Sequence, residues 1–294
     1  MSLVDLDFAA AHAAKILATI TFHYNPDRLV YLAGVVAALA EFPVKKLDVI
    51  ILTNSEDKTE LSTLVMMCRE LLSSPDQSIL VVMCQNMAHP FELTWYHKPH
   101  IAGKFLSDPV GYTHFIYLED DVKISFVNFC YFVTYRKFLQ EHTLIPSFLR
   151  VEFSENHKRH FNTENVRRVN METVAQKSII DYGDYQFLNP PIAYIGMFIL
   201  DVELAKEYLQ SPMMDIVQSA NLCPETWGLR ERASAGLLYV NVPEHFSSRY
   251  VVPVLKQNNT PAMLSWIYHL PNTYADNPGA SIGKITMSDL FNGH

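Results

Sequence analysis

The chain of 294 residues is predicted to be an α/β protein with a Rossmann-type, mixed but mostly parallel sheet flanked by helices. Apolar runs of strand length alternate with helix-length segments over the first eighty residues, which indicates βαβ units with right-handed crossovers. A later apolar run, Phe115–Leu118, ends in three consecutive carboxylates. Such a run is typical of a buried parallel strand.

The first half of the chain has a regular alternation of strand-length and helix-length segments. Turn residues separate its segments, and neither a G-x-G-x-x-G pattern nor a P-loop follows any strand, so an ordinary dinucleotide site or P-loop is not expected. The expected elements are a strand at Lys15–Phe22, a helix at Leu29–Phe42, a strand at Leu47–Asn54, a helix at Lys58–Leu72 and a strand at Ser78–Cys84.

The rest of the chain has a less even pattern. Residues 150–185 show no clear periodicity and indicate an excursion from the sheet, and Asp201 is expected to cap a helix. The expected elements are a helix or broken helix at Trp95–Leu106, a helix at Phe126–Gln140, a strand at Asn189–Asp201 with Gly196 in its middle, a helix at Val202–Gln210 and a strand at Leu237–Val242. A glycine within a strand marks a place where backbone or ligand approaches closely.

Composition sets broad limits on function. Hydrophobic residues make up 49% and charged residues 18% of the chain, as in ordinary globular proteins. The formal net charge of −8 argues against nucleic-acid binding, because no basic surplus is present to neutralise phosphates. The four cysteines form no C-x-x-C pair, which favours buried free thiols in a reducing compartment.

No membrane segment is expected from the sequence. The longest apolar run, Leu29–Ala40, is too short to cross a bilayer, and no signal-peptide pattern precedes it. We therefore expect a cytoplasmic protein. The catalytic part of a membrane-tethered protein would show the same pattern.

The main candidate site is the acidic strand end, which we define as Glu119, Asp120 and Asp121. Ligands of open α/β sheets bind at the carboxyl ends of strands. Adjacent carboxylates repel each other by roughly 1 kcal/mol per close pair at surface dielectrics, and a bound cation relieves that repulsion. Mg²⁺ or Mn²⁺ would suit these oxygen ligands. The alternative is a solvated turn that caps a helix.

Two other segments carry candidate chemistry. Lys98 lies just upstream of the acidic strand, where a cation could meet a phosphate. The three nearby histidines lack a zinc spacing, which favours structural or stacking roles over metal binding. Glu225 and Glu231 are two further carboxylates, and the second lies between two arginines. An amphipathic helix with ordinary ion pairs would explain them equally well.

The chain resembles the GT-A class of nucleotide-sugar glycosyltransferases, of the family 2-like kind with an E-D-D variant of the acidic D-x-D motif. The resemblance covers most of the chain by order and spacing, although only the acidic motif in its strand is specific. It is carried by Tyr117–Val122 as the acidic motif, Tyr194–Ile199 as the later strand and Glu225–Glu231 as the catalytic-base segment.

This resemblance implies one GT-A-like domain, with a nucleotide-sugar-binding half over about 15–125 and an acceptor half with a tail over about 126–294. It also implies that Asp121, with Asp120, holds Mn²⁺ or Mg²⁺ on the diphosphate of a UDP- or GDP-sugar. Glu119 and Asp120 would contact ribose or metal-bound water. The residues that would line the nucleotide pocket by position are Thr21, His23, Asn25, Arg28 and Asn54.

Residues nearer the C-terminus would complete the site in this interpretation. His269 would join the metal or diphosphate shell, unless it is a capped or packed histidine. Glu231, slightly preferred to Glu225, would take the proton of the acceptor hydroxyl in an inverting reaction. The motif is E-D-D rather than D-x-D, and the base segment lacks the Glu-Asp pair of many inverting members, so a retaining mechanism stays open.

The expected function is a metal-dependent glycosyltransferase acting on a glycan or glycolipid acceptor, as in polysaccharide biosynthesis. The aromatic segment 91–97 and the basic stretch 157–168 suit a glycan acceptor, including an acidic one. Peripheral membrane association through the acceptor is a further expectation. A metal-dependent phosphohydrolase or nucleotidyltransferase, and a non-catalytic nucleotide- or glycan-binding module, are the two alternatives.

Overall fold

The computed structural model describes residues 6–293, and the chain divides into two compact units. The parallel-sheet unit comprises Ala9–Val122 and Gly196–Val240. The mixed-sheet unit comprises the chain up to Phe8, Lys123–Ile195 and the chain from Asn241 onward. Within residues 6–293, no helix is both long enough and apolar enough to cross a membrane.

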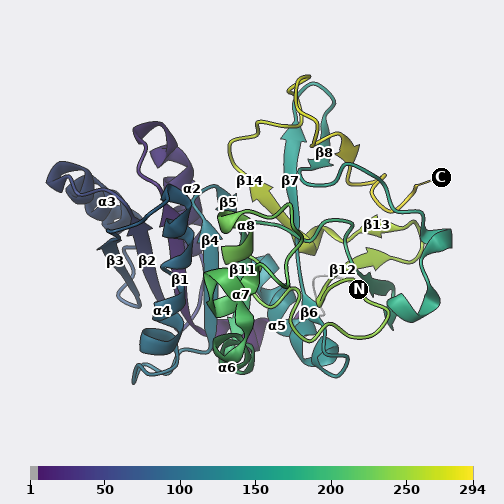
Figure 1. Cartoon of the computed structure of the whole chain (residues 1–294), viewed down its shortest axis with the longest axis horizontal. Coiled ribbons are helices and arrows are strands. Elements are labelled where there is room, and N and C mark those ends of the chain that lie inside the picture. The colour runs from purple at the N-terminus through teal and green to yellow at the C-terminus, as the bar shows by residue number, and fades with distance from the viewer. Residues whose placement is uncertain (1–5, 294) are drawn as a thin grey trace. The chain divides into compact units, whose positions relative to one another are not determined.

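The parallel-sheet unit is built on one five-stranded sheet with the order β11-β4-β1-β2-β3 (Figure 1). Neighbouring strands are parallel except for β11, which runs antiparallel to β4. The strands are β1 (Lys15–Phe22), β2 (Lys46–Thr53), β3 (Gln77–Met83), β4 (His114–Glu119) and β11 (Met197–Asp201). The prediction of a mixed, mostly parallel sheet flanked by helices is confirmed for this unit.

Aspartate side chains at the start of three helices of this unit accept hydrogen bonds from free backbone N–H groups. Asp57 accepts hydrogen bonds from the backbone of Thr59 and Glu60, and Asp201 accepts one from Leu204, as predicted. The helices are α2 (Leu29–Ala40), α3 (Lys58–Leu71), α4 (Lys98–His100), α6 (Val202–Gln210), α7 (Ile216–Ser219) and α8 (Leu229–Ala233). Shorter 3₁₀ or π turns are η2 (Pro26–Arg28), η3 (Pro90–Trp95), η4 (Ile101–Phe105) and η7 (Pro212–Met214).

Two expectations for this unit were wrong. Residues 237–242 form turns, in which Leu238 and Val240 donate to carbonyls three residues earlier, so the apolar run is buried without being a strand. Strand β11 begins after Gly196, whose φ of +68° takes the chain out of an extended conformation. The broken helix expected after Trp95 is present as α4 and η4.

The mixed-sheet unit contains two small sheets and the helix α5 (Phe126–Gln140), whose bounds are those predicted. One sheet has the order β15-β8-β7-β14-β5, with strands Ile285–Thr286, Arg159–Asn162, Leu149–Ser154, Trp266–His269 and Val122–Lys123. The other has the order β13-β12-β10-β9, with strands Thr260–Pro261, Tyr250–Leu255, Tyr185–Leu188 and Ile180–Tyr182, and β6 (Ile145–Pro146) pairs with β12.

The remaining elements are short. They are η5 (Met171–Thr173), η6 (Gln176–Ser178) and η8 (Met263–Ser265) in the mixed-sheet unit, and α1 (Phe8–His12) and β5 (Val122–Lys123), which span the boundaries between the units. The excursion from the parallel sheet expected over residues 150–185 is confirmed, because the segment belongs to the mixed-sheet unit, where it contains β8, β9 and most of β7. These strands are too short to show a clear period in the sequence.

The core of the parallel-sheet unit is aromatic around β4. The rings of Tyr117 and Phe198 stack with centroids 5.3 Å apart, and His97 lies 4.3 Å from Tyr117. Burial lowers the pKa of His97 well below its ordinary value, and its Nδ1 lies 2.6 Å from the carbonyl oxygen of Thr94. His97 is therefore a core residue of the parallel-sheet unit.

Asp48 joins three segments of the parallel-sheet unit. This buried carboxylate on β2 accepts hydrogen bonds from the hydroxyls of Ser78 and Tyr112, and it lies 3.2 Å from Lys46 Nζ. Burial alone would raise its pKa, but these hydrogen bonds outweigh burial and lower it below the ordinary value. The ionised form therefore stabilises the fold.

We predict that Asp48→Asn lowers the free energy of unfolding by about 1–3 kcal/mol at pH 7. Because the folded pKa is lowered, the stabilisation is present above the ordinary aspartate pKa of about 3.9 and is lost as the pH falls through the folded value. Urea unfolding over this range should show the difference from wild type shrinking with acidity. Glu70→Gln, at an exposed position of α3, is the control. A loss that is constant with pH would contradict the prediction.

Candidate functional site

The order of strands in the parallel sheet reverses between β1 and β4. From β1 the chain continues to β2 and β3 on one side, whereas β4 lies on the other side of β1. The two strands are parallel, with Thr21 paired to Glu119, so their carboxyl ends lie at the same edge. Such a switch point is where ligands bind in open α/β sheets.

Two residues of the acidic strand end, Asp120 and Asp121, bind Arg28 at this point. Arg28, the last residue of η2, donates from Nε to Asp120 Oδ2 at 2.8 Å and from Nη2 to Asp120 Oδ1 at 2.7 Å. The same Nη2 donates to Asp121 Oδ2 at 2.8 Å. One guanidinium nitrogen thus lies between two carboxylates.

The electrostatics of this cluster combine burial with pairing. Glu119, Asp120 and Asp121 are each less than a tenth exposed, so they are not the solvated turn of the alternative interpretation. Burial raises the pKa of Asp120, and the hydrogen bond from Arg28 opposes that rise. Hydrogen bonding to Asp120 raises the pKa of Arg28 above its ordinary value. The structure therefore places a cation, the Arg28 guanidinium, on Asp120 and Asp121, which we call the acidic pair.

Gly196 explains how the third carboxylate is accommodated. A Cβ built on this glycine would lie 3.0 Å from Oε2 and 3.1 Å from Cδ of Glu119, and 3.2 Å from a methyl group of Val122. The sequence predicted that backbone or ligand approaches this glycine, whereas the group that approaches it is the side-chain carboxylate of Glu119.

A cavity of about 270 Å³ opens at the carboxyl ends of β1, β2 and β3. His23 and Asn54, which were assigned to a nucleotide pocket by position, both line it. The backbone N–H of Tyr24 donates to Asn54 Oδ1 at 2.8 Å, which leaves Nδ2 3.3 Å from His23 Nε2. The other lining residues are Glu56, Cys84, Gln85, Asn86, Met87 and Pro90.

Sequence reasoning missed the segment 84–87 in this cavity. The segment follows β3 as His23 follows β1 and Asn54 follows the last residue of β2, so the same positional argument would have found it. Two other predicted pocket residues have structural surroundings. Asn25 caps η2 by accepting from the backbone of Asp27 at 2.9 Å, and Thr21 is buried within β1.

Lys98 makes interior contacts. Its Nζ donates to the carbonyl oxygen of Met213 and lies 3.3 Å from the centre of the Trp95 ring. Burial lowers the pKa of its amine to about 6. The Lys98 side chain is enclosed, and the phosphate contact expected of this residue stays a prediction.

The two candidate bases differ in their surroundings. Glu231 lies in the first turn of α8, is about a quarter exposed and forms an ion pair with Arg230 at 3.3 Å. This helix packs on η3, where Trp95 Nε1 donates to the carbonyl oxygen of Leu229 at 3.0 Å. Glu225 is exposed on the preceding loop. Of the two, only Glu231 is held by a packed helix.

His269 belongs to a buried cluster of the mixed-sheet unit. Its Nδ1 lies 2.6 Å from Glu152 Oε1, and its ring stacks on Tyr274 with centroids 5.2 Å apart. Glu152 also accepts from the backbone N–H groups of Thr273, Tyr274 and Ala275. The packed-histidine alternative describes these surroundings, and a metal role for His269 stays a prediction. A cavity of about 290 Å³ also borders His269.

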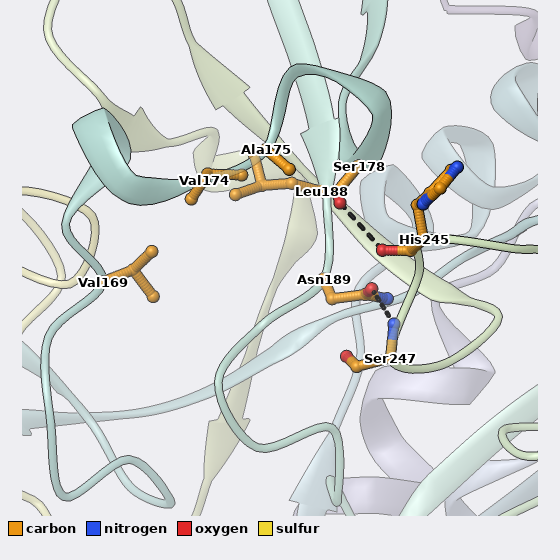
Figure 2. A pocket seen from close by; sticks show the side chains of 8 residues that line it. All are labelled: Val169, Val174, Ala175, Ser178, Leu188, Asn189, His245 and Ser247. Carbon is orange, nitrogen blue, oxygen red and sulfur yellow. Dashed lines mark hydrogen bonds between the residues drawn. The ribbon is translucent and has the colours of Figure 1, made fainter.

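Another cavity of the mixed-sheet unit, of about 210 Å³, is shown in Figure 2. Ser178 donates to the carbonyl oxygen of His245 at 2.8 Å, and Asn189 Oδ1 accepts from the backbone of Ser247 at 2.8 Å. Figure 2 shows the His245 ring directed away from the other labelled side chains. The polar side chains of Ser178 and Asn189 in this cavity therefore bond to the protein itself.

A metal site and buried free thiols were also predicted. Within residues 6–293, no three His, Cys, Asp or Glu side chains form a group that could hold a metal ion. The acidic pair instead brings two carboxylates onto one cationic nitrogen, a donor set of the kind a divalent ion uses. All four cysteines are free and buried, as predicted.

We predict that Gly196→Ala lowers the free energy of unfolding by about 1–2 kcal/mol, because it adds a Cβ at positive φ against the Glu119 carboxylate. Gly103→Ala is the matched control, since a Cβ there meets no atom within 4 Å. Denaturant unfolding of both variants checks this. Equal stabilities of the two variants would contradict it.

No protein-family model matches the sequence, and no curated protein matches it.

Proposed function

We propose that the protein is a metal-dependent glycosyltransferase that moves a sugar from a nucleotide-sugar donor to a glycan or glycolipid acceptor. The observation that carries this proposal is the buried acidic strand end at the switch point between β1 and β4. The GT-A resemblance of the sequence supports the same function. The cavity lined by His23 and Asn54 at that sheet edge suits the nucleoside.

In this proposal Asp120 and Asp121 hold Mn²⁺ or Mg²⁺. Their fitness is supported by their convergence on Arg28 Nη2, which shows that both carboxylates can face one cation. The ion, when bound, stabilises the negative charge that develops on the departing diphosphate. Glu119, whose carboxylate has room because Gly196 carries no side chain, contacts the ribose or a metal-bound water.

The proton of the acceptor hydroxyl goes to Glu231 in this proposal. The packing of α8 on η3 supports the choice, because a general base must stay in a defined position. Arg230, which also lies 5.8 Å from the Phe91 ring, is close enough to β4 for its charge to act on Tyr117. These contacts place α8 in the neighbourhood of the acidic strand.

We predict that UDP- or GDP-linked ligands raise the melting temperature only with Mn²⁺ or Mg²⁺, and that Asp121→Ala removes the shift. A ligand at a hundred times its dissociation constant adds about 2.7 kcal/mol to stability. A thermal-shift panel of UDP-, GDP-, CMP- and dTDP-linked ligands, with and without metal, checks this.

The control for that panel is Glu244→Gln, at a carboxylate 89% exposed in the mixed-sheet unit, which should keep the full shift. Metal-dependent stabilisation that survives in Asp121→Ala would refute the assignment of this site. Hydrolysis of a phosphoanhydride without any sugar requirement would instead favour a phosphohydrolase.

We also predict that Glu231→Gln lowers sugar transfer by about 10²–10⁴-fold while donor binding is retained, because only the proton acceptor is lost. Glu225→Gln is the matched control, since it removes the neighbouring carboxylate from an exposed loop. Turnover with a panel of glycan acceptors, together with the thermal shift by the donor, separates catalysis from binding. A larger loss in Glu225→Gln would reverse the assignment.

A further inference from the structure

We propose that Arg28 and the divalent ion compete for Asp120 and Asp121, and that the ion releases Arg28 to bind the diphosphate of the donor. The inference deepens the proposed function and rests on it, since that function supplies both the ion and the donor. It concerns a residue that the resemblance assigns only to the lining of the nucleotide pocket.

The competition follows from the geometry of the pair. Nη2 of Arg28 lies 2.7 Å from Asp120 Oδ1 and 2.8 Å from Asp121 Oδ2. An ion held by both carboxylates would need the region where that nitrogen now lies. Two cations cannot occupy it together, because of both their size and their mutual repulsion. An ion that uses these same two oxygens must therefore displace the guanidinium.

The loop that carries Arg28 allows such a displacement. The side chain of Asn25 caps η2, and Pro26 begins the turn, so the backbone of the loop is held independently of the arginine side chain. The Arg28 side chain is one-third exposed, whereas both acids are about nine-tenths buried. The long arginine side chain can thus move while the carboxylates stay in place.

The released guanidinium has a ready partner. A guanidinium fork matches phosphate oxygens as well as carboxylate oxygens. In the structure Nε and Nη2 both donate to the acids, so these donors are committed to the carboxylates. Release by the ion would turn them toward an incoming diphosphate at the same sheet edge. Metal binding and donor binding are then coupled through one residue.

This coupling predicts that removing the Arg28 guanidinium has opposite effects on two affinities, which a purely structural role would not produce. Removal of the guanidinium should tighten the binding of the ion, because a competitor is gone, and weaken the binding of the diphosphate, because a ligand is gone. A residue that only supports the fold would weaken both. The two affinities must therefore be measured separately.

The test uses the whole chain with Mn²⁺ alone, monitored by electron paramagnetic resonance of the free ion. Arg28→Gln should bind Mn²⁺ roughly tenfold or more tightly than wild type, as expected for loss of a charge-assisted hydrogen-bonded competitor. Arg28→Lys should lie between them, because a lysine keeps the charge without the fork. Arg168→Gln, which breaks an exposed ion pair with Asp289, controls for the loss of one positive charge.

A second titration measures UDP and GDP binding at saturating Mn²⁺, where Arg28→Gln should bind the diphosphate roughly tenfold more weakly than wild type and Arg168→Gln should not differ. Mn²⁺ binding that is no tighter in Arg28→Gln overturns the competition, including the case in which neither form binds the ion. Tighter or unchanged diphosphate binding overturns the release.

The outcomes also separate this inference from the proposed function. Tightened Mn²⁺ binding in a protein that binds no nucleotide in any form supports the competition and counts against the glycosyltransferase. Metal-dependent nucleotide binding with unchanged Mn²⁺ affinity in Arg28→Gln overturns the competition and leaves the glycosyltransferase standing. Melting curves of all variants confirm that each is folded.

Discussion

The arrangement of the parallel-sheet unit depends on the need to neutralise three carboxylates that are buried together at a strand end. Removing a charge from water is costly unless an opposite charge and hydrogen bonds replace the solvent. The counter-charge, Arg28, is 92 residues away from Asp120 in the chain. Only the parallel pairing of β1 with β4 brings the loop after β1 to the end of β4. The topology of the sheet therefore supplies an opposite charge that stabilises the acidic strand end.

The same topology gathers the polar residues that follow the other strands. His23 and Asn54 each come directly after a strand, and both line one cavity, because parallel strands end at a common edge. Lys98 does not follow a strand. It lies in a broken helical segment whose aromatic residues pack inward, and its amine is enclosed with the ring of Trp95. Position at a strand end, rather than nearness in sequence to the acids, decides which residues reach the site.

The sequence predicts this fold best where the pattern is local and long. β1, α5 and α6, each a local run of eight or more residues, have the predicted bounds. The mixed-sheet unit is different, since β7 pairs with β14, more than a hundred positions along the chain, and such pairing leaves no local period. The contact between Glu152 and His269 is equally long-range. Candidate residue types could thus be named from the sequence, but their partners could not.

In the proposed function, formal charges favour the binding of an anionic donor only after the divalent ion has bound. Counted by themselves, ionised Asp120 and Asp121 with Arg28 carry a formal charge of −1, which repels a diphosphate. In the proposed function, a divalent ion added to these three groups would bring their total to +1 and would turn the guanidinium from a partner of the acids into a partner for phosphate. Because the carboxylates are buried, water screens these charges poorly and the change is felt strongly at the sheet edge. If the proposed function holds, an arginine at this position would therefore make the attraction of the site for an anionic donor conditional on the ion.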